Sequence, residues 1–169
     1  MSEVKVFKDL ENRTLVLERE FHGSKHKVWK AYADKDWFEA WWGPEGWETT
    51  VKEFNFVPGG RVHYAMKCVD EAQGEWFGKV EWGLMEIVDV DKPNTFTYKD
   101  LFANEDGSVR EGMPQMVVKV DLVDDTRKTN LVIQSTADSA EQIEELVKMG
   151  MVEGFSSQMN KLDELLAKE

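Results

Sequence analysis

The sequence predicts an α+β fold in which a curved antiparallel sheet wraps around one long C-terminal helix, with two short helices after the first strand. Two patterns carry this prediction. Segments between residues 61 and 136 alternate apolar and polar side chains as strands do, whereas residues 139–166 place apolar side chains three and four positions apart. The 169 residues contain no evident linker or repeat, so we expect a single domain over residues 1–169.

The first predicted strand covers residues 14–21, where apolar side chains of one parity share a face: Leu15, Leu17 and Phe21. Arg19 has the same parity and puts a charge on that face. The favoured interpretation is that the strand ends or bulges at Arg19. The alternative is that Arg19 is a polar anchor inside a cavity.

Two short helices are predicted next. Ser24 is a suitable N-cap for the first. In the second, Asp36 and Glu39 have capping-box spacing, and Gly43-Pro44 supplies the stop. This second helix begins the segment DWFEAWWGPEGW (36–47), which contains four tryptophans: Trp37, Trp41, Trp42 and Trp47. We expect Trp41 and Trp42 to be mainly structural and at most two of the four to reach a ligand.

Strands are predicted through the middle of the chain. Residues 61–69 alternate, and residues 75–90 form a long apolar stretch whose glycines, Gly78 and Gly83, indicate a strongly curved strand. Further strands are predicted at residues 96–102, 115–123 and 128–136, the last two as an antiparallel hairpin with one wet face.

One long helix is predicted from about residue 139 to residue 166. Its start is marked by Asp138 with Glu141 or by Ser139 with Gln142. Gly150 and Gly154 fall on its apolar stripe, where each glycine costs about 1 kcal/mol relative to alanine. Two reasons would fit: close backbone packing against the sheet, or empty volume left beside flexible methionines.

Charge and composition restrict the partners. The net charge of −12 disfavours nucleic acid and anionic membrane surfaces. No window approaches 18 uncharged apolar residues, so we expect no membrane insertion. The single cysteine, Cys68, and the lack of a signal-peptide pattern at the N-terminus favour a cytoplasmic location.

Motifs for common chemistry are missing from the sequence. His22 and His26 are four residues apart, but the predicted helix begins between them, so a shared metal site is disfavoured. Cys68 has the apolar parity of its strand and is read as a buried thiol rather than a nucleophile. No nucleophile elbow or phosphate-binding glycine loop occurs. The sequence therefore names no catalytic residue, cofactor or metal.

Seven segments, in order and spacing, resemble the heat-shock-protein-90 ATPase activator-like branch of the START-like (SRPBCC, helix-grip) superfamily. They are LEREF (17–21), VWKAYAD (28–34), WWGPEGW (41–47), VPGG (57–60), GLMEIVDVDKPNTFTY (83–98), KTNLVI (128–133) and GMVEGF (150–155). One departure is Met151, where family members often have tryptophan. The resemblance implies a helix-grip fold with an apolar cavity between the sheet and the C-terminal helix.

The main functional hypothesis is a binder of a small apolar or aromatic molecule in that cavity. The side chains predicted to line it, with ordinary core packing as the alternative for each, are Tyr64, Met66, Trp76, Trp82, Met116, Met151, Phe155 and Met159, joined by Arg19 as a polar group. A second hypothesis is a protein-interaction module, including a chaperone partner, formed by the tryptophans. A third is a cyclase- or hydrolase-like enzyme, which requires ionisable groups with shifted pKa values in the cavity.

Overall fold

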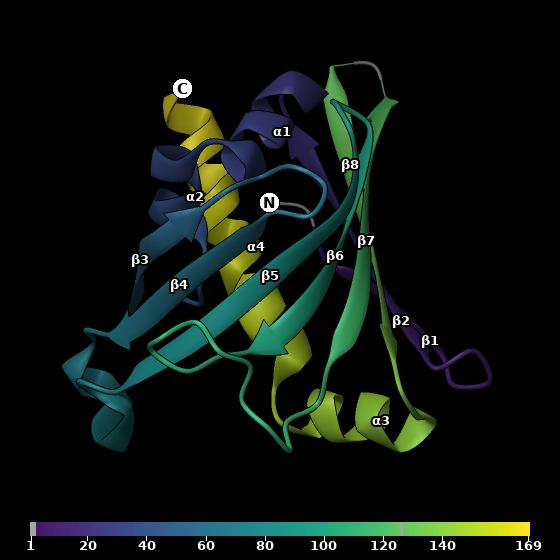
Figure 1. Ribbon diagram of the computed structural model, residues 1–169. Helices are drawn as coiled ribbons and strands as arrows, with labels where there is room; N and C mark the ends of the chain where they lie inside the picture. The colour runs from purple at the N-terminus through teal and green to yellow at the C-terminus, as the bar shows by residue number, and fades with distance from the viewer. Residues whose placement is uncertain (1–2, 126) are drawn as a thin grey trace.

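The computed structural model describes residues 3–125 and 127–169 and shows one eight-stranded antiparallel sheet (Figure 1). Its strand order is β1-β2-β8-β7-β6-β5-β4-β3. The strands are β1 (Lys5–Asp9), β2 (Thr14–His22), β3 (Trp47–Phe54), β4 (Arg61–Cys68), β5 (Val80–Asp91), β6 (Thr95–Phe102), β7 (Met116–Asp125) and β8 (Lys128–Ala137). The predicted α+β class and the antiparallel β7–β8 hairpin are confirmed.

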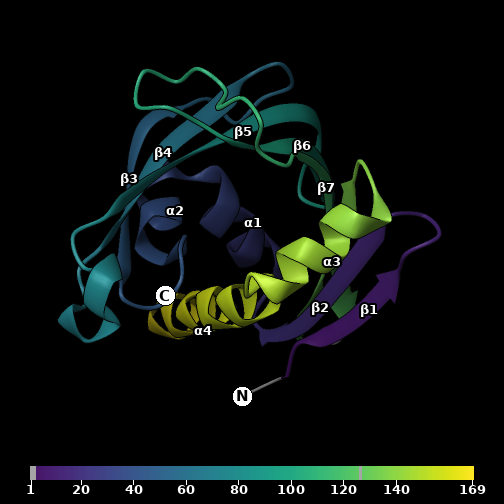
Figure 2. The same ribbon diagram turned by 90° about the horizontal axis from the view of Figure 1, so that it is seen from below.

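The sheet curves into an arc around the helices, as the view along its open end shows (Figure 2). The pairing register shifts between Val51 and Glu53 in β3 and between Ile87 and Asp89 in β5. Such bulges bend a strand and increase its twist. Helices α1 (Lys25–Ala33) and α2 (Lys35–Trp41) lie inside this arc, and α4 (Met151–Lys168) runs across its open side.

The caps of the two short helices match the prediction only for the first. Ser24 Oγ accepts a hydrogen bond from the Lys27 backbone N–H at 3.3 Å and caps α1. The cap of α2 is Asp34 rather than Asp36, because Asp34 Oδ1 accepts from two backbone N–H groups at 3.0 and 3.1 Å. Glu39 instead accepts from the Val51 N–H of β3 at 2.7 Å, which joins α2 to the sheet.

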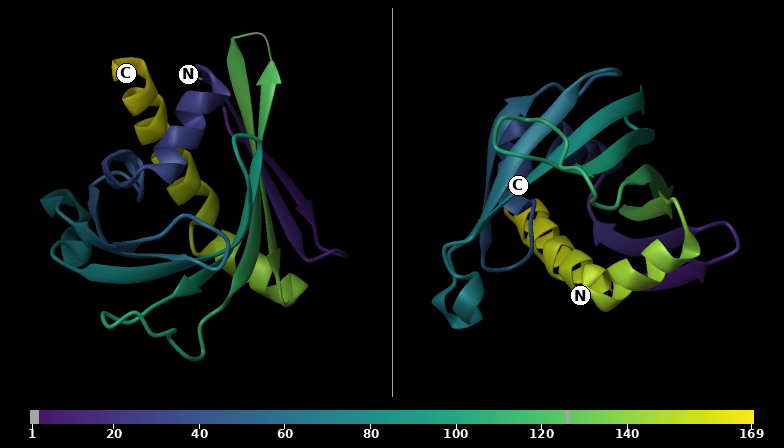
Figure 3. Two further views of the ribbon diagram at one scale, coloured as in Figure 1. Left: turned by 45° about the horizontal axis from the view of Figure 1, so that its top comes forward. Right: turned by 60° about the horizontal axis from the view of Figure 1, so that its bottom comes forward.

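The C-terminal helix is two helices, not the single long one predicted. Helix α3 (Ala140–Lys148) ends just before Gly150, whose φ of +93° is left-handed. Helix α4 then starts at Met151 in a new direction (Figure 3). Gly150 therefore ends the first helix and permits the turn, and neither proposed reason for a glycine inside a helix applies to it.

The prediction did not include β1 or a short 3-10 helix, and it anticipated β3 only as a strand that Trp47 enters. Strand β1 is an edge strand whose five residues are all exposed, so it has no apolar face to signal it. A short 3-10 helix, η1 (Glu71–Trp76), occupies the start of the predicted long strand, and β5 begins only at Val80. Gly78 has a φ of +84° before β5 rather than bending a strand.

The tryptophan segment fills the inside of the arc. Trp41 is fully buried and its indole N–H donates to the Ala31 carbonyl at 2.8 Å. Trp42 is 8% exposed and stacks on Phe38, with ring centroids 4.7 Å apart. Trp37 and Trp47 are half-buried. The structural role expected for Trp41 and Trp42 agrees with this burial, because losing so large a buried ring costs about 3–5 kcal/mol.

His63 lies on the polar parity of β4 but is buried. The connection between β6 and β7 crosses the outer face of the sheet (Figure 1) and brings Asn104 to His63. There the Asn104 carbonyl accepts from His63 Nε2 at 3.0 Å, and Leu84, Leu101 and Ala103 form a small separate core.

Within the described residues, no helix is long and apolar enough to cross a membrane.

Candidate functional site

The cavity between the sheet and the C-terminal helices has an outer and an inner compartment. The outer compartment has a volume of about 440 Å³ and lies between β4–β7 and the α3–α4 turn. Its lining residues are Tyr64, Met66, Glu81, Trp82, Gly83, Asp100, Leu101, Phe102, Arg110, Met113, Pro114, Met116, Leu146, Met149 and Met151.

The inner compartment has a volume of about 180 Å³ and adjoins the outer one, since Asp100, Met116 and Met151 line both. Its other lining residues are Leu17, Tyr32, Trp42, Tyr98, Val118, Ile133, Ser135, Phe155 and Gln158. The inner compartment is therefore bounded by the sheet, by α1 and α2, and by α4. Residues from the middle of β6 and the start of β7 mark the junction between the two compartments.

Methionines form much of the outer wall. Among the described residues, five methionines line the outer compartment: Met66, Met113, Met116, Met149 and Met151. Methionine is unbranched and polarizable, so such a wall can adjust to apolar ligands of different shape. Gly83 adds space for the ring of Tyr64, because a Cβ at residue 83 would overlap that ring.

Asp100 is the one charged group among the residues that line the inner compartment. It follows Phe96 and Tyr98 on the inward parity of β6, and its cross-strand neighbours are Met85 in β5 and Met116 in β7. Neither neighbour offers a hydrogen-bond donor. Burial raises the pKa of the Asp100 carboxyl from 3.8 to about 6.

Three tyrosines lie near this carboxyl, and all stay neutral under ordinary conditions. Burial raises the pKa of Tyr64 and Tyr98, and the nearby Asp100 carboxylate adds to both shifts. Burial also raises the pKa of Tyr32. Around Asp100 the site therefore combines neutral aromatic rings and flexible methionines with this one carboxylate.

Six of the nine side chains predicted to line a cavity do so: Tyr64, Met66, Trp82, Met116, Met151 and Phe155. Trp76 does not, because it lies on η1 with 46% of its surface exposed and faces Trp47 at a centroid distance of 6.3 Å. Met159 does not either, because it is fully buried in the main core.

Arg19 is also outside the cavity lining, and the strand does not end or bulge there. Strands β2 and β8 pair without interruption through Arg19 and Leu131. The guanidinium donates to the Met159 carbonyl at 2.8 Å and lies 3.5 Å from Asp163 Oδ2. Arg19 therefore anchors α4 to the sheet. The alternative interpretation of Arg19 as a polar anchor is the better one, although its side chain does not line the cavity.

Sequence reasoning missed the aromatic and acidic part of the inner compartment. Tyr32, Trp42, Tyr98 and Asp100 were not among the predicted lining residues. For Asp100 a signal was present: it interrupts the alternation of Phe96, Tyr98 and Phe102 on one face of a strand. A carboxylate at an inward position either has a partner or faces a cavity.

The described residues offer little other chemistry. They contain no cluster of three or more His, Cys, Asp or Glu side chains that could hold a metal ion. His22 ends β2 and His26 lies in α1, and both are exposed. Cys68 is fully buried, with its Sγ 3.7 Å from Gln73 Oε1.

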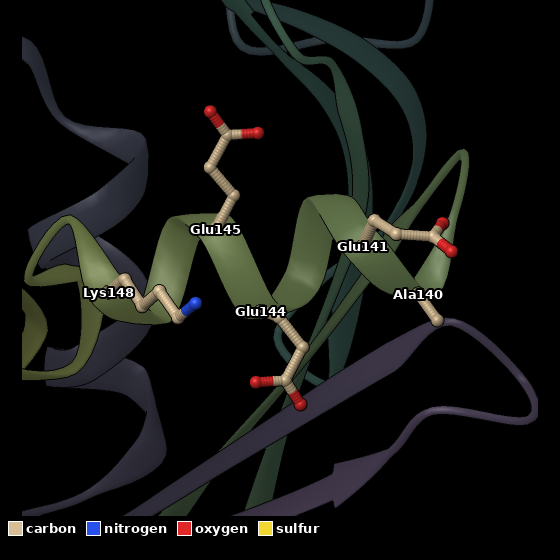
Figure 4. A pocket seen from close by; sticks show the side chains of 5 residues that line it. All are labelled: Ala140, Glu141, Glu144, Glu145 and Lys148. Atoms are coloured by element: carbon tan, nitrogen blue, oxygen red, sulfur yellow. The ribbon is translucent and has the colours of Figure 1, made fainter.

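An open hollow of about 390 Å³ along α3 is lined by Ala140, Glu141, Glu144, Glu145 and Lys148. Their side chains point in different directions around the helix and converge on no common point (Figure 4). Glu144 forms an exposed ion pair with Lys8 at 3.5 Å. This hollow is a solvated helix face rather than a site.

Comparison with known proteins places the chain among similar structures of the same architecture. Residues 23–167 match the family described as Activator of Hsp90 ATPase homolog 1-like protein. The structure resembles protein Ms6760 from Mycobacterium smegmatis, at 33% identity and a TM-score of 0.85, covering 97% of each chain.

Two solution structures are also similar. A protein from Arthrobacter aurescens shares 28% identity with a TM-score of 0.86, covering 98% of this chain and 92% of the other. A protein from Staphylococcus epidermidis shares 26% identity with a TM-score of 0.82, covering 96% and 93%. Comparison with the curated proteins returned no match.

Proposed function

This chain belongs to the Activator of Hsp90 ATPase homolog 1-like protein family, and we propose that it binds a small apolar or aromatic molecule in the cavity between its sheet and α4. The observation that carries the proposal is the pair of adjoining compartments, about 440 and 180 Å³, with methionine and aromatic walls. Ligand pockets of proteins typically combine such apolar walls with a few polar groups. Asp100 supplies the charged one.

The two alternative functions have less support. In the tryptophan segment Trp41 and Trp42 are buried, so they are not available to a chaperone or other protein, and Trp37 and Trp47 are half-buried. An enzyme would need a pair of ionisable groups in the cavity. Asp100 and Tyr98 line the inner compartment and both have raised pKa values, mainly because of burial, so this requirement is met. Binding ranks ahead of catalysis because it needs only the cavity, whereas catalysis also needs a substrate on which this pair would act.

The proposal is tested by NMR on protein labelled with 13C at the methionine methyl groups. Three aromatic probes are titrated: neutral 4-phenylbutan-2-one, cationic 3-phenylpropyltrimethylammonium and anionic 4-phenylbutanoate. For probes of this size a Kd on the order of 0.1–1 mM is expected. Binding in the cavity should shift the signals of Met116 and Met151, which line both compartments, more than that of Met159, which lines neither.

A blocking variant makes the test specific. Met151→Trp places a large ring at the junction of the compartments and should weaken probe binding at least tenfold. Glu153→Trp is the matched control, because Glu153 is exposed on the same helix and does not line either compartment. Failure of all three probes to shift any methionine that lines the cavity would remove the proposal.

A further inference from the structure

We propose that the ligand of this cavity is an organic cation, with a positively charged nitrogen beside Asp100 and the inner aromatic rings and an apolar portion along the methionine wall. This inference rests on the proposed function, because it names a ligand class for the same cavity. It would give Asp100 a specificity-determining role.

The first argument is the missing partner of Asp100. Within the described residues no hydrogen bond or ion pair reaches its carboxylate, and the residues opposite it in the sheet are Met85 and Met116. Asp100 is half-buried and lines a largely apolar cavity, and a carboxylate in such a place without a partner is less favourable than a paired one. The residues that line the inner compartment include no cationic side chain, and a ligand cation would supply the positive charge opposite Asp100.

The second argument is that aromatic side chains surround the carboxylate. Tyr32, Trp42 and Tyr98 line the same compartment of about 180 Å³. Proteins recognise ammonium groups by placing them against aromatic rings, and the attraction increases when water is excluded. A carboxylate beside three aromatic rings is therefore better matched to an ammonium group than to a neutral or anionic one.

The third argument is the charge balance of the whole cavity. The other charged lining residues, Glu81 and Arg110, lie in the outer compartment and form a mutual ion pair at 3.8 Å. Glu81 and Arg110 offset each other, which leaves the charge of Asp100 uncompensated. The negative net charge of −12 adds a field that attracts cations and disfavours anions.

The fourth argument concerns space. Beyond the junction formed by Asp100, Met116 and Met151, the outer compartment of about 440 Å³ is walled largely by methionines. A cation held in the inner compartment would extend any attached apolar group into this space. The cavity therefore suits an amphiphilic cation rather than a small hydrated ion, for which the inner compartment offers a single carboxylate and the described residues offer no group of ligands.

Binding of such a ligand should depend on pH. A cation favours the ionised form of Asp100, whose pKa in the unliganded protein is raised to about 6 by burial. The tyrosines around it, Tyr32, Tyr64 and Tyr98, remain neutral because burial raises their pKa values. The charged residues that share the outer compartment with it, Glu81 and Arg110, are paired with each other. At pH 5 about one carboxylate in eleven is ionised, so the affinity should be about tenfold lower than at pH 7.5.

The test compares the same three probes on the intact protein at pH 7.5, with Kd values from methionine methyl shifts. The cationic probe should bind at least tenfold more tightly than 4-phenylbutan-2-one, and 4-phenylbutanoate should bind most weakly. Asp100→Asn should weaken the cation at least tenfold while changing the affinity for the neutral probe less than threefold. Asp89→Asn is the control, because it removes an equal charge from an exposed position on β5.

Each outcome separates this inference from the proposed function. Equal binding of the cationic and neutral probes, or an Asp100→Asn variant that keeps full affinity for the cation, would overturn the cation assignment and leave ligand binding intact. Absence of binding by all three probes would overturn both. If Asp100→Asn fails to fold, the pH dependence of the unsubstituted protein decides: an affinity for the cation unchanged between pH 5 and 7.5 refutes the assignment.

Discussion

Asp100 places a carboxyl group between two methionines, Met85 and Met116. We expect the free energy of unfolding to depend on whether this carboxyl is ionised. Its pKa is about 6 in the folded protein against an ordinary value of 3.8, so folding favours the protonated form. The folded state therefore binds more protons than the unfolded state between about pH 4 and 6. Over that window the contribution of Asp100 to the free energy of unfolding falls as pH rises, by about 2–3 kcal/mol in total.

Removing this charge should stabilise the protein only where the carboxyl is ionised. Asp100→Asn should raise the free energy of unfolding by about 1–2 kcal/mol at pH 7.5, since the amide remains a half-buried polar group, and by much less at pH 4.5. Urea unfolding at the two pH values measures this difference. Asp89→Asn should show no such difference. An equal effect of Asp100→Asn at both pH values would contradict the raised pKa of Asp100.

Arg19 shows how a single residue can be read correctly in part. Its parity identified a charge on the inner face of a strand, but parity alone could not say what partner it meets. The partner is supplied by α4, which is 140 residues away in sequence and places the Met159 carbonyl 2.8 Å from the guanidinium. Burial lowers the pKa of Arg19, and Asp163 opposes that shift. Only the packing of helix on sheet determines these contacts.

Among the elements, the break between α3 and α4 most affects the site. It sets Met149 and Met151 on either side of a turn, and both line the outer compartment. If one straight helix continued through residue 150, Met149 and Met151 would instead project from a single helix axis. The left-handed backbone of Gly150 therefore contributes to the shape of the cavity.

The two glycines of this region should respond in opposite ways to alanine. Gly150→Ala should lower the free energy of unfolding by about 1–2 kcal/mol, because its φ of +93° is strained for any residue with a Cβ. Gly154→Ala should raise it by about 0.5–1 kcal/mol, since Gly154 lies within α4 and an added Cβ meets nothing within 4 Å. Thermal and urea unfolding of both variants check the prediction. A Gly150→Ala protein as stable as the unsubstituted one would show that the turn can rearrange.

At the scale of the whole molecule, the acidic surface should make stability depend on salt. With 33 acidic and 21 basic side chains, the folded chain concentrates a net charge of −12. Screening should reduce this repulsion, whereas the exposed ion pairs it also weakens contribute little each. The midpoint of thermal unfolding should rise by about 2–4 °C between 10 and 150 mM NaCl, as followed by circular dichroism.

A charge variant provides the control for this prediction. The double substitution Glu11→Lys and Asp89→Lys changes two exposed positions and reduces the net charge from −12 to −8, because each replacement adds two positive units. Its salt dependence should be smaller than that of the unsubstituted protein. A midpoint that falls with added salt would mean that attraction between exposed charges outweighs the repulsion.

Much of the architecture could be predicted because it rests on local patterns. Alternation marked β2, β4, β6, β7 and β8, and a long apolar stretch marked β5. The spacing of apolar residues marked the C-terminal helical region, and Ser24 marked the start of the first helix. Strand β1 could not be found in this way, because an exposed edge strand lacks an apolar face. The break at Gly150 was also missed, since apolar spacing continues across it and only the backbone conformation interrupts the helix.

The sequence alone determined the α+β class, the arrangement of a sheet around C-terminal helices, the inward placement of most lining residues and the family resemblance. Only the tertiary structure decided which inward side chains pack solidly and which face a cavity, because parity predicts a side of the sheet and not the distance to the opposite layer. Met159 and Met151 share a stripe, yet the first is core and the second lines both compartments. The significance of Asp100 likewise depends on its surroundings, which are two methionines and three tyrosines, with no hydrogen bond to its carboxylate from the described residues.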